Sequence, residues 1–244
     1  MTTDDIIKKT ADKIKKSRYM IAFTGAGIST ESGIPPFRGE NGIWNQYDPK
    51  VLSLEYFKKD PAEAWIFIKE IFYDFLEDTK PNKAHKVLAE LERKGILKSI
   101  TTQNIDGLHE ASGSPNVINF HGSTENLVCL KCGEKFPAKN FDSKIPVCPK
   151  DKKILKPDFV FFGEGIPQKA YTKAFEEALK ADLVLVTGTS GEVMPANMIP
   201  YQAKQNGAEI IEINPHESAF TGTITDLYIK SPVSFALEKI INLL

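Results

Sequence analysis

The sequence has few cysteines, no long apolar run and almost no excess charge, and each feature excludes a class of protein. Three cysteines, an odd number, argue against a disulfide framework. No apolar run approaches the roughly 18 residues of a membrane-spanning helix, and the charged, amphipathic N-terminus does not resemble a signal peptide. A net charge of −1 over 244 residues gives no overall electrostatic footprint for nucleic acid or an anionic membrane. We therefore expect a soluble cytoplasmic protein that binds neither membrane nor nucleic acid directly.

A glycine-rich stretch near the N-terminus lacks part of the dinucleotide-binding fingerprint. Gly25 and Gly27 follow the apolar run 19–23, so they stand where a buried strand would turn into a helix or loop. Glycine there allows positive φ and close approach to a phosphate, which exposed N–H groups can bind. The Rossmann fingerprint needs a third glycine, where Thr30 stands, and an acidic residue about 20 positions on, where the sequence indicates an irregular loop. Taken alone, the two glycines are weak evidence for a nucleotide site, and a plain strand-to-loop turn explains them nearly as well.

The segment after these glycines favours the nucleotide site. It reads Gly-Ile-Pro-Pro-Phe-Arg-Gly over 33–39. Two prolines stiffen such a loop, and Phe37 beside Arg38 offers an apolar ring and a bidentate cation. The pattern is typical of a lid over an anionic ligand and is unusual for a loop that only connects two elements of secondary structure.

Short apolar runs alternate with amphipathic helical segments along most of the chain, which predicts an α/β fold with a Rossmann-like doubly wound parallel sheet. Two segments break this rhythm: 40–80 is helical with a strongly apolar face, and 127–156 carries all three cysteines. We expect the helical insertion 40–80 and a zinc-ribbon-like module 127–156 to form a smaller domain. The Rossmann-like nucleotide-binding domain then comprises 1–39, 81–126 and 157–244.

Polar side chains follow the predicted strands, at the sheet edge where ligands bind. Asn104 and Asp106 come directly after one strand; in an arbitrary protein they would form an Asx turn that caps the next helix. His121 follows another strand and precedes a glycine, which leaves the imidazole little obstructed. Its near-neutral pKa suits a general base. The other three histidines, His85, His109 and His216, are interpreted as bystanders.

The cysteines follow a metal-ligand spacing with one departure. Cys129-x-x-Cys132 is followed after 15 residues by Cys148-x-x-Asp151, where a fourth cysteine would complete a structural zinc ribbon. A carboxylate also binds zinc, so a Cys3Asp site is feasible, although it is less soft. The alternative is a degenerate ribbon that keeps its shape without metal. In both cases the expected role is structural.

Together, these motifs and those at 160–164 and 188–190 resemble the sirtuins, the NAD-dependent protein lysine deacylases, in the expected order over nearly the whole chain. The resemblance implies a prokaryotic or archaeal-type deacetylase that transfers the acetyl group of acetyl-lysine to ADP-ribose and releases nicotinamide and O-acetyl-ADP-ribose. NAD is the implied cofactor, and an acetylated protein or peptide is the implied partner.

The resemblance also implies residue roles. His121 would take a proton from a ribose hydroxyl, Asn104 would hold the ribose and an ordered water, and Phe37 would exclude water. The implied NAD-binding residues are Gly25, Ala26, Gly27, Ser29, Ile34, Phe37, Arg38, Gln103, Asn104, Ile105, Asp106, Gly188, Thr189, Ser190, Asn214 and Val233. The acyl-lysine peptide would lie as an added strand against Val160, Phe162, Gly163, Glu164 and Val193.

Acyl preference and the competing functions are further expectations. Sirtuins that prefer succinyl or malonyl groups carry a Tyr-x-x-Arg pair at positions that Ile68 and Ile71 occupy here. Two isoleucines cannot pair with a carboxylate, so we expect acetyl or longer apolar acyl groups. The alternatives are a mono-ADP-ribosyltransferase or NAD glycohydrolase that uses the same pocket, and a non-catalytic NAD sensor. We expect a monomer, because no apolar stripe is left over once the insertion packs on the sheet.

Overall fold

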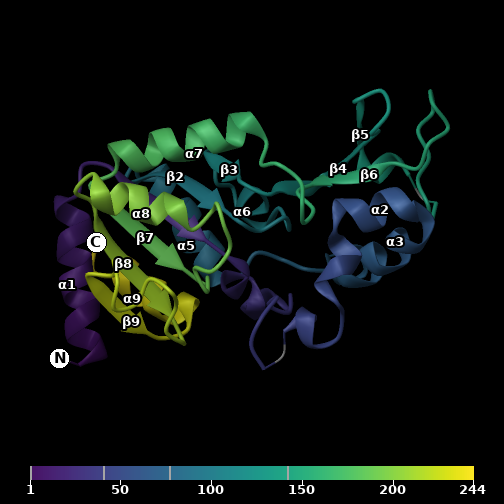
Figure 1. The fold of residues 1–244 in the computed structure, drawn as a ribbon. Helices are drawn as coiled ribbons and strands as arrows, with labels where there is room; N and C mark the ends of the chain where they lie inside the picture. Colours follow the sequence, from purple (N-terminus) through teal and green to yellow (C-terminus); the bar gives the residue numbers. More distant parts are fainter. Residues whose placement is uncertain (1, 41, 77, 142) are drawn as a thin grey trace.

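The computed structural model describes residues 2–40, 42–76, 78–141 and 143–244. A larger part contains a six-stranded sheet covered by helices on both faces, and a smaller part lies beside it with its own sheet and short helices (Figure 1). In the described part of the chain, no helix is both long enough and apolar enough to cross a membrane.

The large sheet is parallel throughout and has the order β3-β2-β1-β7-β8-β9. The chain therefore starts near the middle, at β1, and winds outward in both directions, which confirms the predicted doubly wound fold. The strand order reverses between β1 and β7, and ligands of such sheets bind at the carboxyl ends of the strands at that point. The strands are β1 (Met20–Thr24), β2 (Leu97–Thr102), β3 (Val117–Asn119), β7 (Leu183–Thr187), β8 (Glu209–Asn214) and β9 (Leu227–Lys230).

Helices cover both faces of this sheet because alternate strand residues point to opposite faces and both sets are apolar. Met20 and Ala22 of β1 pack in one core cluster, whereas Ile21 and Phe23 pack in the other. The first face carries α1 (Thr3–Lys16), α5 (Lys83–Arg93) and α9 (Val233–Ile241); the second carries α7 (Gln168–Lys180) and α8 (Met198–Gln205) (Figure 1). A short α6 (Leu108–Ala111) follows β2.

The smaller part joins two segments that lie far apart in the sequence. Its antiparallel sheet has the order β5-β4-β6, and Trp65 Nε1 of the helical segment donates to Leu155 O of the ribbon segment at 2.7 Å. This sheet begins at Gly122 and ends at Phe159, so it extends beyond 127–156 at both ends. The elements are α2 (Leu54–Lys59), α3 (Pro61–Ile68), a π-helical turn (Lys69–Tyr73), α4 (Asp74–Leu76), β4 (Gly122–Val128), β5 (Lys135–Pro137) and β6 (Lys156–Phe159). Short 3-10 turns lie at Ala26–Ile28, Thr30–Ser32, Ile43–Asn45, Pro49–Leu52 and Ala138–Asn140.

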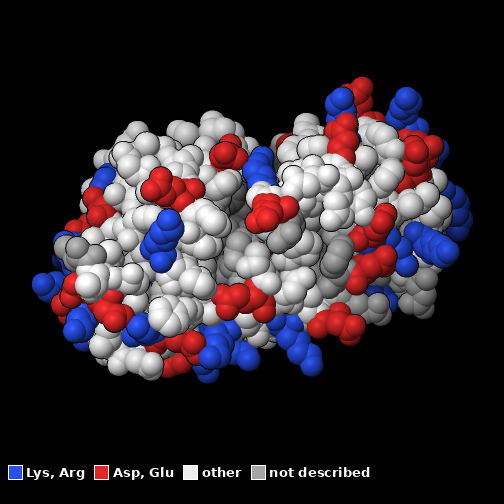
Figure 2. All heavy atoms as spheres, turned by 90° about the horizontal axis from the view of Figure 1, so that it is seen from below, with Lys and Arg blue, Asp and Glu red and all other residues white. Residues whose placement is uncertain are grey.

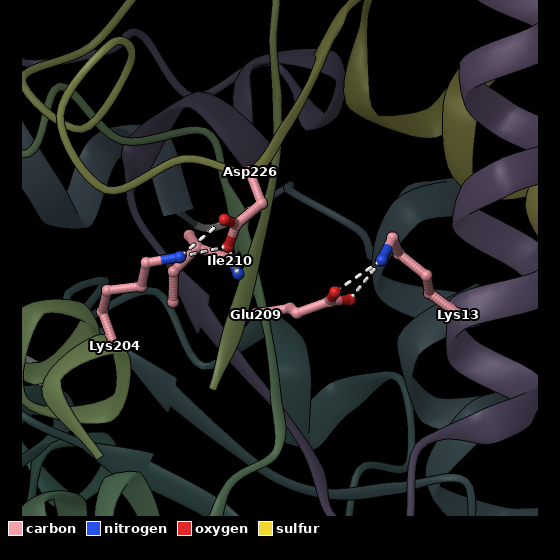
Figure 3. A network of polar contacts seen from close by, with 5 residues as sticks. All are labelled: Lys13, Lys204, Glu209, Ile210 and Asp226. Carbon is pink, nitrogen blue, oxygen red and sulfur yellow. Dashed lines mark hydrogen bonds and ion pairs between the residues drawn. The ribbon is translucent and has the colours of Figure 1, made fainter. Parts of the chain in front are cut away.

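Charged contacts fasten helices of both faces to the start of β8, at the sheet edge opposite the strand carboxyl ends (Figure 3). Lys13 of α1 pairs with Glu209, and Lys204 of α8 pairs with Asp226 at 2.6 Å. Asp226 also accepts a hydrogen bond from Ile210 N at 2.8 Å. Ion pairs this exposed contribute about 0–1 kcal/mol each, so they assist the apolar core and do not replace it.

Candidate active site

Two glycine loops interlock at the point where the strand order reverses. Gly27 N donates to Gly188 O at 2.7 Å, and a Cβ placed on Gly27 would lie 2.8 Å from Gly188 Cα. A Cβ on Gly188 would lie 2.2 Å from Ile28 N, and this residue has φ +61°. The φ angle of Gly25 is −132°, and that of Gly27 is not positive either. The two N-terminal glycines are therefore required by the contact between the β1 and β7 loops, and the positive φ expected from the sequence is wrong for them.

A cavity of about 760 Å³ opens over these loops, between the carboxyl edge of the large sheet and the smaller part. The predicted residues that line it are Gly25, Ala26, Gly27, Phe37, Arg38, Gln103, Asn104, Ile105, His121, Val160, Phe162, Gly163, Glu164, Gly188, Thr189, Ser190, Val193 and Asn214. Ser29, Ile34 and Asp106 line a small second cavity that shares Ala26, Phe37 and Asn104 with the first. Of the predicted residues in the described part of the chain, Val233 lines neither cavity. It is the first residue of α9 and is buried in the core beside the sheet.

The His121 imidazole is fixed by its neighbour on the adjacent strand. Its Nδ1 lies 3.1 Å from Gln103 O, and a carbonyl oxygen only accepts, so Nδ1 carries the proton and Nε2 is left as the basic nitrogen. Burial lowers the pKa of His121 below 6.5, and the hydrogen bond to Gln103 O opposes this in part. The ring is therefore neutral at pH 7, as a general base must be.

Asp106 and Asn104 meet at the Ser29 hydroxyl. Ser29 Oγ donates to Asp106 Oδ2 at 2.7 Å, and Asn104 Nδ2 donates to Ser29 Oγ at 3.1 Å. Asp106 Oδ1 also accepts from Leu108 N at 2.9 Å, which is an Asx turn that leads into α6. The N-cap residue of α6 is Gly107, so the expected capping of this helix by a side chain is wrong. Burial raises the pKa of Asp106. The Asx turn and a place beside the small cavity therefore belong to the same side chain.

Two histidines interpreted as bystanders lie directly behind this network. His85 Nε2 is 3.4 Å from Ser29 Oγ, and His109 Nε2 is 2.9 Å from Thr24 Oγ1. Their ring centroids are 4.9 Å apart, and neither Nδ1 has a hydrogen-bond partner among the described residues. Burial lowers the pKa of His85 to about 4 and that of His109 to about 3. Both imidazoles are therefore neutral parts of the wall that supports Ser29.

The predicted lid closes one side of the cavity. Phe37 stacks on Trp44 with ring centroids 5.3 Å apart and also contacts Phe72. Arg38 Nε lies 3.1 Å from Glu192 Oε2, which belongs to the loop after β7. An aromatic face and a cation thus line the cavity, and the guanidinium already has a carboxylate partner in Glu192.

The segment 160–164 forms a further part of the cavity wall, and the centroid of its Phe162 ring lies 6.0 Å from that of Trp44, the ring on which Phe37 stacks. Val160 N donates to His121 O at 2.8 Å, and Phe162 exchanges backbone hydrogen bonds of 3.0 Å with Leu52 and Leu54. Phe161 is buried, as expected, whereas Phe162 is 47% exposed. Glu164 Oε2 accepts from Phe161 N at 2.9 Å. Hydrogen bonds therefore fix the backbone of this wall, and one of them joins it to the backbone of His121.

The predicted metal ligands also come together. One ligand atom from each of Cys129, Cys132, Cys148 and Asp151 lies within 4.8 Å of all the others. A tetrahedral site with Zn–S bonds of about 2.3 Å has ligand atoms roughly 3.8 Å apart, so this donor set fits zinc. Among the described residues that line the large cavity, none comes from 127–156. The position of the group supports a structural role.

A sequence profile of the Sir2 family matches residues 25–195, more than half of the chain. The chain belongs to the Sir2 family. An NAD-dependent protein deacylase of Pyrococcus furiosus is 46% identical over 237 residues, which cover 94% of each chain. An NAD-dependent protein deacetylase of Saccharolobus solfataricus is 44% identical over 243 residues, which cover 97% of this chain and 96% of the relative.

Solved structures of Sir2 proteins share the fold of this Sir2-family chain. A Sir2 homologue in complex with NAD matches with a TM-score of 0.90 at 40% identity, over 97% of this chain and 93% of that one. A Sir2 mutant with a deacetylated p53 peptide and 3′-O-acetyl ADP ribose matches with a TM-score of 0.92 at 35% identity, over 97% of both chains.

The Sir2-family zinc group gives a prediction that does not depend on activity. Purified protein is expected to contain about one zinc ion per chain, because three thiolates and a carboxylate converge within bonding reach. Asp151→Ala should weaken zinc binding roughly tenfold or more, and Asp151→Cys should strengthen it, since a thiolate is the softer ligand. Metal analysis and competition with a chromophoric chelator measure both effects.

Asp158→Ala is the matched control, because Asp158 pairs with Lys135 in the same sheet and is outside the metal group. A zinc content near zero in the wild-type protein would show that the ribbon keeps its shape without metal.

Proposed function

We propose that this chain is an NAD-dependent protein lysine deacetylase, which transfers the acetyl group of acetyl-lysine to ADP-ribose and releases nicotinamide and O-acetyl-ADP-ribose. The observation that carries the proposal is the His121 imidazole, whose Nδ1 is held by Gln103 O in the wall of a cavity floored by interlocked glycine loops. When bound, NAD supplies a glycosidic carbon that accepts the acyl oxygen as nicotinamide leaves.

The cavity walls fit the parts of a dinucleotide. The β1 and β7 loops lie at the carboxyl ends of parallel strands, where backbone N–H groups bind phosphate. Arg38 would replace its Glu192 contact with a contact to phosphate, and Asn214 would hold the adenosine ribose. Asn214 Nδ2 already donates to Thr189 O at 3.0 Å, which fixes the amide beside the β7 loop. Val233 stays a predicted adenine neighbour through the backbone at the start of α9.

His121 acts as the general base. Its Nε2 takes a proton from a ribose hydroxyl, and its Nδ1–H bond to Gln103 O keeps the correct tautomer and orientation. Asn104 positions the ribose and a water, with its amide oriented by Ser29. Phe37 excludes bulk water, which would otherwise hydrolyse NAD before the acyl group arrives.

The acyl-lysine peptide is proposed to lie along 160–164. Sir2 proteins have been solved with p53 peptides, with NAD in one case and with 3′-O-acetyl ADP ribose in another. In this chain the backbone of Val160 and Phe162 is held by His121, Leu52 and Leu54, and both backbone groups of Phe161 bind Glu164. Among the described residues, the carbonyl of Val160 and the N–H of Gly163 have no hydrogen-bond partner, so these are the groups proposed to meet the peptide strand. Val160 and Phe162 would enclose the lysine stem, and Val193 would face them across the peptide.

The acyl group is predicted to be acetyl or a longer apolar acyl. Ile68 and Ile71 are both buried, and Ile71 lines the small cavity with Phe72. A succinyl carboxylate would be buried there unpaired, at a cost of about 3 kcal/mol or more, which is roughly 100-fold in kcat/KM against succinyl-peptide. Kinetics with matched acetyl- and succinyl-peptides measure this ratio.

The double variant Ile68→Tyr, Ile71→Arg should move preference toward succinyl-peptide by supplying the missing cation and hydroxyl. Ile66→Arg is the matched control, because Ile66 lies on the same helix and is 64% exposed. Equal kcat/KM for both acyl groups in the wild-type protein would contradict the assignment.

A labelled-NAD assay separates the competing functions. With acetyl-lysine peptide, the proposed reaction yields equal amounts of nicotinamide, deacetylated peptide and O-acetyl-ADP-ribose. A mono-ADP-ribosyltransferase would instead label protein, a glycohydrolase would give ADP-ribose while the peptide stays acetylated, and a sensor would give no turnover.

The remaining properties are proposed from charge and thiol chemistry. Lys, Arg, Asp and Glu side chains are interspersed over the face in Figure 2, and among the described residues there they do not gather by sign. Together with the net charge of −1, this supports the proposal that the chain does not bind nucleic acid or membrane directly. The three cysteines form no disulfide and lie within one group of possible metal ligands, which agrees with a cytoplasmic location.

We propose that the protein is a monomer. Size-exclusion chromatography coupled to light scattering tests this.

A further inference from the structure

Lys156 is a buried lysine next to the active-site wall. It is the first residue of β6, and its side chain is 2% exposed, although lysine is almost never fully buried without a partner. Nothing in the sequence marks it, because it stands in a lysine-rich segment whose other lysines are exposed. Its burial therefore indicates a specific environment built around the ammonium group.

All three donors of the ammonium group are used within one short segment. Nζ donates to Pro157 O at 2.8 Å and Phe159 O at 2.6 Å, and it lies 3.0 Å from Glu164 Oε2. The same nitrogen lies 4.1 Å from the centroid of the Phe161 ring, within cation–π range. Burial lowers the pKa of Lys156, and the Glu164 charge opposes that shift. The chain from 156 to 164 thus wraps around one ammonium ion.

The segment that it holds is the proposed peptide wall. Glu164 Oε2 also accepts from Phe161 N at 2.9 Å, so one carboxylate oxygen joins the ammonium to the middle of the 160–164 turn. Val160, inside this turn, donates through its N–H to His121 O. Glu164 lines the cavity, yet its Oε2 is occupied by the chain itself. The ion pair therefore acts on the backbone that meets the peptide on one side and His121 on the other.

We propose that the ion pair between buried Lys156 and half-buried Glu164 is a positioning device for the acyl-lysine peptide: it sets the backbone of 160–163 so that a peptide strand binds in register with His121. This inference rests on the proposed deacetylase function. Lys156 is a positioning residue, because it acts through Val160 and Phe161 and touches no reacting atom.

A purely structural role makes a different prediction. Replacing a buried ion pair by apolar groups often leaves stability unchanged, whereas removing one partner leaves an unpaired buried charge. If the pair served stability alone, its loss would lower the melting temperature and weaken NAD and peptide binding together. If it positions the wall, its loss raises KM for acetyl-peptide selectively, because among the described residues neither Lys156 nor Glu164 forms a hydrogen bond or ion pair with the loops after β1 and β7, where NAD is proposed to bind.

The test is steady-state kinetics with acetyl-lysine peptide, together with NAD affinity measured by calorimetry without peptide. Lys156→Met and Glu164→Gln should each raise the peptide KM roughly tenfold or more while NAD affinity stays within about twofold. Lys156→Arg, which keeps the charge, should recover most of the loss. The double variant Lys156→Met, Glu164→Gln should be less impaired than the sum of the single variants, since neither charge is then left unpaired.

Lys135→Met is the matched control: this exposed lysine pairs with Asp158 of the same sheet at 2.6 Å, and its peptide KM should equal that of the wild type. Should Lys156→Met not fold, Glu164→Gln and Lys156→Arg decide alone. Unchanged peptide KM in the folded variants, or parallel loss of NAD and peptide affinity, overturns the inference. Absence of deacetylation by the wild-type protein would instead refute the proposed function.

Discussion

Substituting His121 by alanine is expected to lower the rate of deacetylation by a factor of about 10²–10⁴, the usual contribution of a positioned general base. The physical reason is that Nε2 is the nitrogen left free to take the ribose proton once Nδ1 binds Gln103 O. NAD affinity should stay near the wild-type value, because the glycine loops and Arg38 are untouched. Single-turnover kinetics and calorimetry measure the two quantities separately.

The pH profile provides a second readout of the same residue. Because burial lowers the pKa of His121 below 6.5, the base is already deprotonated at pH 7, and kcat/KM should fall only as pH drops through that lowered pKa. This acid limb should disappear in the residual activity of His121→Ala. Deacetylation by His121→Ala or His121→Tyr at near wild-type rate would reject His121 as the base.

Acidification from pH 7 to pH 5 is expected to lower the free energy of unfolding by about 4 kcal/mol through His85 and His109 alone. Their folded pKa values, about 4 and about 3, lie below the unfolded value of 6.5. The unfolded chain therefore binds protons between pH 6.5 and pH 4 that the folded chain excludes, so stability is lost as pH falls through this window. Urea unfolding at pH 7, 6 and 5 measures the change.

Other groups modify this profile in known directions. The lowered pKa of His121 adds to the loss, whereas the raised pKa values of Asp106 and Glu92 oppose it. The difference between the wild type and His85→Asn, His109→Asn therefore isolates the pair, and the double variant should show a flatter pH dependence. Identical slopes for the two proteins would contradict the burial of two neutral imidazoles.

The parts of this structure that could be predicted are those encoded by local pattern. The alternation of apolar runs and amphipathic helices predicts the doubly wound sheet, and α7 (Gln168–Lys180) shows the regular apolar spacing from which such a helix can be recognised. The strand ends carry Asn104, His121 and Gly188, so the shared carboxyl edge of a parallel sheet brings them together without further information.

The parts that could not be predicted depend on contacts between distant segments. The contact of Gly25 and Gly27 with the β7 loop involves residues more than 150 positions away, so the sequence alone could not show that this contact is what requires glycine at both positions. In the sequence, His85 looks like any other helix residue. Its place behind the site depends on Asn82, which caps α5 and donates to Ile28 O at 2.7 Å, so that the start of the helix is held against the loop after β1. Lys156 is hidden among exposed lysines because burial is a property of the assembled fold.

A crystal structure of this protein with a slowly reacting NAD analogue and an acetyl-lysine peptide tests the proposed mechanism most directly. We predict the pyrophosphate on the loops after β1 and β7, the peptide strand along 160–164, and His121 Nε2 within hydrogen-bonding distance of a ribose hydroxyl. An imidazole turned away from the sugar, or a dinucleotide bound elsewhere, would contradict it.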